Sequence, residues 1–155
     1  MTEKQNILDK LKAFRQRDKF STSAWNERGL NPSDNEMCYR LESLFNNCAD
    51  NLINAISTGQ NSKQLKSILK QGLENFKSFD YDTEEREFIC DYFSQLSEII
   101  NVDFKDSLNN WLYGRVLNSL IKIAYFFKGR EKIIETLSQN CTSCDSKLET
   151  FMALF

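Results

Sequence analysis

Two cysteines near the end of the chain have a spacing at which thiols do chemistry. Cys141 and Cys144 lie in the stretch SQNCTSCDSK, with two small polar residues between them. Thiol chemistry needs a lowered pKa in one thiol, and a helix that begins just after the pair would favour the thiolate. Asp145 opposes this, because a neighbouring carboxylate raises the pKa of a thiol. Redox pairs of this spacing usually follow a strand in a mixed α/β fold, so we expect a loop.

A zinc site would need two more ligands in addition to this pair. The chain has no histidine, so the other ligands must come from Cys38, Cys48, Cys90 or carboxylates. Cys48 and Cys90 fall on or beside predicted core faces, where cysteine is common as a small apolar side chain. We therefore predict no metal and no cofactor.

The lack of histidine also excludes Ser/His and Cys/His catalytic arrangements. General acid and base pairs of carboxylates leave no spacing pattern, so carboxylate catalysis stays open. An acidic cluster precedes one predicted helix, where acidic side chains stabilise the helix N-terminus, and it lacks the glycine and terminal glutamate of a calcium loop. The cluster consists of Asp80, Asp82, Glu84, Glu85 and Glu87. We favour the role at the helix start and predict that the chain is not an enzyme.

One group of aromatic and basic residues is typical of an interaction surface. Trp25 and Arg28 lie in a predicted loop, while Trp111, Tyr113 and Arg115 flank Gly114 on a strongly apolar helix. Trp, Tyr and Arg are enriched at interaction hot spots, so a loop folded over that helix would form a pocket or docking surface. The competing interpretation, which we favour, makes both tryptophans core residues with locally bonded indole N–H groups.

Composition limits the class of partner. A chain of 155 residues with a formal charge of −2 has the length of one domain and lacks the basic excess of nucleic-acid binding proteins. The basic residues near the start, Lys19 included, alternate with acidic ones and indicate a solvated face. The first ten residues, MTEKQNILDK, lack the pattern of a secretory signal peptide. The apolar stretch LNSLIKIAYFF is too short to span a bilayer. We expect a cytoplasmic protein that binds neither nucleic acid nor membranes.

Helical spacing of apolar residues, with one proline and five glycines, predicts an all-α fold. The first helix covers residues 3–17. The second starts at Asn31 before Pro32, or at a capping box of Ser33 and Glu36, and runs to Thr58 before Gly59.

Three or four further helices complete the predicted fold. A third helix, capped by Ser62, ends near Phe79, and a fourth begins at a capping box of Asp82 and Glu85. A fifth starts at residue 106 or 107. The tail suggests a short helix with Ile133, Ile134 and Leu137 and a last one behind Ser146 and Glu149. The prediction is one domain, residues 1–155, built as a bundle of five or six mostly antiparallel helices.

The segment DTEEREFICDYFSQLSEII, followed by NNWLYG, covers Asp82 to Gly114. It resembles a small bacterial all-helical family known as a domain of unknown function. The resemblance implies a compact helical fold and a bacterial source, and it brings no catalytic residues.

The function that we predict is non-enzymatic. The apolar and aromatic helix surface favours a cytoplasmic module for protein–protein interaction, such as an immunity or accessory factor, through a protein partner or self-association. A thiol redox or metal-binding protein that uses Cys141 and Cys144 is the alternative.

Overall fold

The computed structural model describes residues 2–114, 132–140 and 147–154. The chain divides into two compact units, Met1–Leu112 and Tyr113–Phe155. The first unit is helical throughout its regular structure, so the prediction of an all-α bundle is confirmed there. Its helices are α1 (Glu3–Gln16), α2 (Thr22–Asn26), α3 (Asn35–Ser57), α4 (Ser62–Glu74), the 3₁₀ turn η1 (Ser78–Asp80), α5 (Thr83–Ile99) and most of a helix over residues 105–114, whose last two residues belong to the second unit.

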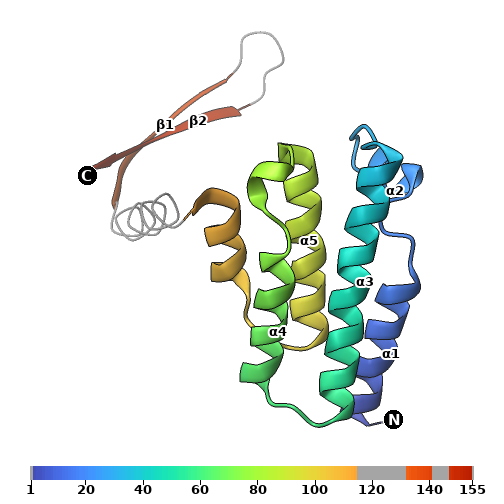
Figure 1. Ribbon diagram of the computed structural model, residues 1–155. Helices are drawn as coiled ribbons and strands as arrows, with labels where there is room; N and C mark the ends of the chain where they lie inside the picture. Colours follow the sequence, from blue (N-terminus) through green and yellow to red (C-terminus); the bar gives the residue numbers. More distant parts are fainter. Residues whose placement is uncertain (1, 115–131, 141–146, 155) are drawn as a thin grey trace. The chain divides into compact units, whose positions relative to one another are not determined.

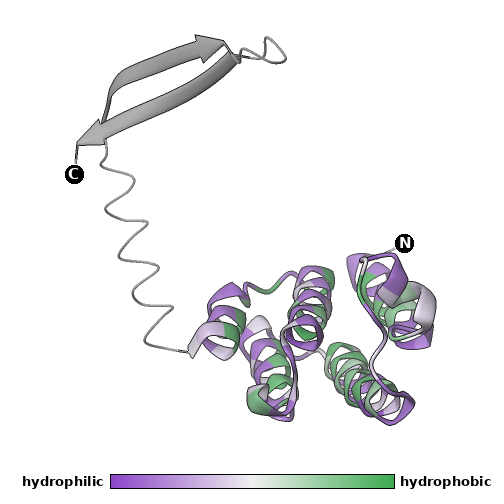
Figure 2. Cartoon of the chain, turned by 90° about the horizontal axis from the view of Figure 1, so that it is seen from above, coloured by the Kyte–Doolittle hydropathy of each residue, from purple (hydrophilic) through white to green (hydrophobic). Residues whose placement is uncertain are grey.

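The four long helices run up and down, with shorter connections from α3 to α4 and from α4 to α5 and with α2 in the longer connection from α1 to α3 (Figure 1). Helix α3 packs against both α1 and α4, and α5 contacts α1 and α4. Seen from above, the hydrophobic residues of these helices face one another (Figure 2). This is the arrangement that amphipathic helices joined by short loops adopt.

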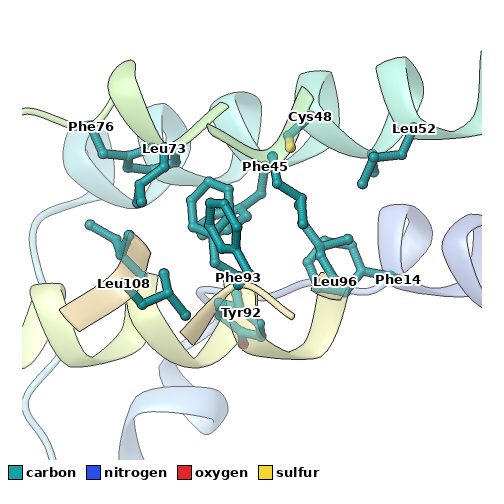
Figure 3. Close-up of a cluster of buried hydrophobic side chains, with 14 of the residues drawn as sticks. Phe14, Phe45, Cys48, Leu52, Leu73, Phe76, Tyr92, Phe93, Leu96 and Leu108 are labelled. Atoms are coloured by element: carbon teal, nitrogen blue, oxygen red, sulfur yellow. The ribbon is translucent and has the colours of Figure 1, made fainter. Parts of the chain in front are cut away.

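The core is rich in aromatic rings, and Phe45 of α3 lies at its centre (Figure 3). The Phe45 ring centroid is 5.0 Å from that of Phe76 and 5.1 Å from that of Phe93. It is also 5.5 Å from that of Tyr92. These tilted and edge-on contacts join α3 to α5 and to the segment after α4, and aromatic pairs in such geometries add to the stabilisation from burial.

Local signals place some helix starts correctly and misplace others. The capping box of Asp82 and Glu85 is present as predicted, with both reciprocal bonds at the start of α5. Helix α3 instead begins after Asp34, whose Oδ1 accepts the N–H of Met37 at 2.8 Å. The predicted starts at Asn31 or Ser33 are wrong, because the Ser33 hydroxyl donates to Glu85 of α5 at 2.6 Å instead.

Two further boundaries need correction. Helix α4 is capped by Asn61, which forms a capping box with Gln64, and ends at Glu74 rather than near Phe79. The predicted loop around Trp25 contains the short helix α2, whose N-cap Ser21 accepts the N–H of Ala24 at 3.3 Å. Helix α2 thereby fixes a segment that composition alone assigns to a loop.

The second unit contains an antiparallel hairpin instead of the two predicted tail helices. Strand β1 (Lys132–Asn140) pairs with β2 (Lys147–Leu154), and Thr136 lies opposite Phe151. The helix predictions for Ile133, Ile134 and Leu137 and for the segment behind Ser146 are therefore wrong. Short apolar runs do not distinguish helix from strand, and β-branched and aromatic residues favour the strand.

Candidate functional site

Trp25 is a core residue. Its side chain is fully buried, and its ring centroid lies 4.4 Å from that of Phe88 on α5. The indole N–H makes no hydrogen bond to any group in the described part of the chain. Trp25 therefore anchors α2 to α5 and offers no exposed surface.

Of the other residues of the predicted surface, Arg28 shares the Phe88 ring with Trp25, whereas Trp111 bonds to the segment after α4. Arg28 forms an ion pair with Asp91, and its guanidinium carbon lies 4.1 Å from the centroid of the Phe88 ring. Trp111 is half-buried on the 105–114 helix and donates its indole N–H to the carbonyl of Phe76 at 2.6 Å.

Helix α2 lies beside the upper part of α3, whereas the 105–114 helix lies beside α4, so no loop carrying Trp25 covers Trp111 (Figure 1). Tyr113 is 48% exposed. Arg115 lies outside the described residues.

The cysteines that the structure describes are poor nucleophiles. Burial raises the pKa of the Cys48 thiol to about 12. Burial, with smaller contributions from Asp91 and Glu87, raises the pKa of the Cys90 thiol to about 12. Burial also raises the pKa of Cys38. Thiolates are scarce at neutral pH under these conditions.

The predicted thiol pair, Cys141 and Cys144, falls outside the described residues. Among residues 2–114, 132–140 and 147–154, no group of three or more Cys, Asp or Glu side chains is arranged to hold a metal ion. In the acidic cluster, Asp82 and Glu85 bond to each other's backbone N–H groups at the start of α5, which is the structural role expected of them.

A buried lysine is the main polar feature that the sequence did not reveal. The Lys19 side chain has no exposed surface, and its Nζ donates to Glu42 Oε1 at 2.5 Å and to Asn46 Oδ1 at 2.9 Å. The same ammonium donates to the carbonyls of Arg17 at 2.9 Å and Phe14 at 3.2 Å, close to the C-terminus of α1. Burial lowers the pKa of Lys19, while the hydrogen bond to Glu42 opposes this change.

This lysine joins three helices. The Glu42 carboxylate also accepts the Lys19 backbone N–H at 3.0 Å, and the hydroxyl of Tyr92 on α5 donates to the Lys19 carbonyl at 2.5 Å. Every polar atom in the cluster therefore has a partner, as a structural network requires. Lys19 does not belong to a basic surface, and its ammonium has no proton left to direct at a ligand.

A groove between α3 and α4 is the candidate binding site. Its volume is about 640 Å³. Its floor is formed by small or apolar residues, among them Cys48 and Ala55 of α3 and Ile68 and Gly72 of α4. A Cβ atom at position 72 would lie 2.7 Å from the Cys48 sulfur, so only glycine allows the two helices to approach this closely. Figure 3 shows Cys48 in its place on α3.

The walls of the groove are polar but uncharged. Six lining residues are carboxamides, contributed by both helices and the connecting turn: Asn47, Asn51, Asn54, Gln60, Gln71 and Asn75. None of the lining residues carries a charge, although 27% of the chain is charged. All six are exposed. Such a surface offers hydrogen-bond donors and acceptors side by side and supplies no group that titrates near neutral pH.

Most side-chain amides in the groove make no hydrogen bond to the described part of the protein. Asn75 donates from Nδ2 to the Gln71 carbonyl at 3.1 Å. For Asn47, Asn51 and Gln71, the described portion of the chain provides no hydrogen bond to the side-chain amide. The sequence did carry a signal for this site. Asn47 and Asn51 on α3 are four residues apart next to an apolar stripe, and so are Gln71 on α4 and its C-cap Asn75.

The fold and the groove together define a small helical-bundle protein with an uncharged, carboxamide-lined groove. The chain belongs to the family described as "Domain of unknown function (DUF4844)", whose model matches residues 2–116. This confirms the resemblance to a helical domain of unknown function and extends it over the whole bundle.

One solved structure shares the fold. A DUF3571 family protein from Acinetobacter baumannii AYE, known from its crystal structure, is 18% identical with a TM-score of 0.67. The match covers 78% of this chain and 99% of that chain. None of the curated proteins matches this sequence. In the portion that the structure describes, no helix has the length and apolar character needed to cross a membrane.

Proposed function

We propose that this chain is a non-enzymatic, bacterial cytoplasmic protein-binding module, an immunity or accessory factor whose partner contacts the α3–α4 groove. One observation carries the proposal: a groove of about 640 Å³ lined by six carboxamides and no charge. Side-chain amides recognise other hydrogen-bonding groups by geometry and do not transfer protons, which suits binding rather than catalysis.

Site-specific crosslinking in the source cell tests the proposal. A photoreactive amino acid replaces Asn51 in the groove, and in a matched control it replaces Asn6, an exposed asparagine of α1. We expect a defined protein to crosslink at position 51 and not at position 6. Its binding should be lost when Asn51 and Gln71 are both changed to arginine, because the two long cations would block the groove. The same crosslinked species at both positions, or none at position 51, would refute the proposal.

Self-association is distinguished in the same experiment. If the crosslinked partner is a second copy of the chain, the product has twice the mass of the protein, and native mass spectrometry should show a dimer that the double arginine variant lacks. A heterologous partner gives any other mass.

A further inference from the structure

Both walls of the groove repeat their amides at the same interval. Asn47 and Asn51 lie four residues apart on α3, and so do Gln71 of α4 and Asn75, the helical C-cap of α4. Four residues of α-helix correspond to a rise of about 6 Å. An extended polypeptide repeats its backbone every two residues, or about 6.6 Å. Each wall therefore presents amides at nearly the spacing at which an extended chain presents N–H and C=O groups along one edge.

The chemistry of the amides matches that of a peptide backbone. Every residue of a polypeptide carries one N–H donor and one C=O acceptor, and these groups must be paired when they leave water. An Asn or Gln side chain carries both complementary groups. Amides on two facing walls can thus pair the two edges of a single extended segment, much as neighbouring strands do in a sheet.

The floor and the lack of charge limit the side chains of such a segment. Cys48 and Ala55 are almost fully buried and Ile68 is partly buried, so the floor beneath such a segment is apolar and suits small or apolar side chains. A charged side chain directed into the groove would lose water without meeting a counter-ion, which is costly. The lining runs from Leu44 to Thr58 along α3, a rise of about 21 Å that corresponds to about six extended residues.

We infer that the α3–α4 groove binds an extended, uncharged polypeptide segment of about six residues, whose backbone is hydrogen-bonded by Asn47, Asn51, Gln71 and Asn75. This inference rests on the proposed function and specifies the kind of partner segment. Recognition of this type depends on main-chain bonds for affinity and on alternate side chains for selectivity. A helical segment would keep its backbone bonds to itself and leave the amides of the groove unused.

The test uses random dodecapeptides displayed on phage and selected against the full-length protein. Enriched peptides are synthesised and titrated by fluorescence polarisation. We expect their central six residues to be uncharged and small or apolar at every second position. Binding should fall at least tenfold when Asn51 and Gln71 are both changed to alanine, and it should be unchanged in Asn6→Ala. Alanine suits exposed helix positions, and the urea midpoint of each variant verifies that it is folded.

The decisive experiment is N-methylation of two backbone amides within the central six residues of the peptide, because it removes hydrogen-bond donors and leaves every side chain in place. A loss of at least tenfold on methylation supports the inference. If the alanine variant loses binding but methylation has no effect, or if the bound peptide is helical by circular dichroism, the extended-segment inference is wrong while the proposed function stands. Enrichment of no peptide, or equal binding to the alanine variant, also overturns the inference and leaves the crosslinking result at position 51 to decide the proposed function separately.

Discussion

A Cβ atom added at Gly72 would lie 2.7 Å from the sulfur of Cys48 and 3.4 Å from its Cβ. This contact sets how closely α3 and α4 approach and therefore how deep the floor of the groove lies. Glycine in the middle of a helix costs about 1 kcal/mol relative to alanine, so its presence in α4 requires a compensating reason. Close packing against Cys48 supplies that reason.

Gly72→Ala should destabilise the protein by about 1–3 kcal/mol, because overpacking outweighs the gain in helix propensity. Unfolding in urea, followed by circular dichroism, measures the change. The second substitution Cys48→Ala removes the sulfur that the new methyl group meets, so the double variant should recover part of the loss. A Gly72→Ala variant that is more stable than the original protein would show that the helices are free to move apart.

Lys19→Met should cost about 2–4 kcal/mol, because it leaves the mostly buried Glu42 carboxylate without its cation while preserving the aliphatic stem. Arg15→Met is the matched control. Arg15 pairs with Asp50 at 2.6 Å, but both side chains are more than 40% exposed, and exposed pairs contribute about 1 kcal/mol or less. Equal effects of the two substitutions on the free energy of unfolding would contradict the structural role assigned to Lys19.

The sequence predicts well those features that depend on residues within one or two helical turns of each other. The capping box of Asp82 and Glu85 and the apolar stripe of α3 depend on neighbours three or four residues away, and both are present. The prediction for the tail is wrong because the local pattern around Ile133 and Ile134 fits a helix as well as a strand. Pairing with β2 decides in favour of the strand.

The groove and the buried lysine depend on residues distant in the sequence. Lys19 is buried only because Glu42 and Asn46 of α3 meet it at the end of α1. Asn51 and Gln71 share a groove only because the turn at Gly59, where φ is 78°, sends α4 back along α3. The sequence shows each of these residues, but it does not show how the helices are aligned when they pack, and that alignment brings the residues together.

The stability of the protein should decline at alkaline pH in a way that depends on Cys48. The pKa of its thiol is about 12 in the folded protein and has an ordinary value of 9.0. Below pH 9 the thiol is protonated in both states and contributes no pH dependence. Between these values the unfolded chain releases the proton that the folded protein keeps, so the free energy of unfolding falls by up to about 1.4 kcal/mol per pH unit.

Cys48→Ala isolates this contribution. Lys19, whose lowered pKa makes stability rise with pH in part of the same range, is present in both proteins and cancels in the difference. The free energy of unfolding, measured in urea from pH 8 to 11, should decrease less steeply for the variant. Parallel curves would mean that the thiol is accessible to water in the folded state.

Removal of residues 117–155 should leave the bundle folded. The compact unit of α1 to α5 ends at Leu112, the family model ends at residue 116, and the relative of known structure matches over 99% of its own chain but only 78% of this one. A bundle that buries Phe45, Phe93 and Trp25 among its own helices has a core of its own, which is what independent folding requires. We expect the fragment 1–116 to unfold cooperatively in urea, with a midpoint close to that of the full chain. A fragment without cooperative unfolding would show that the bundle depends on the C-terminal unit. In that case the hairpin of β1 and β2 would have to be counted among the elements that position the groove.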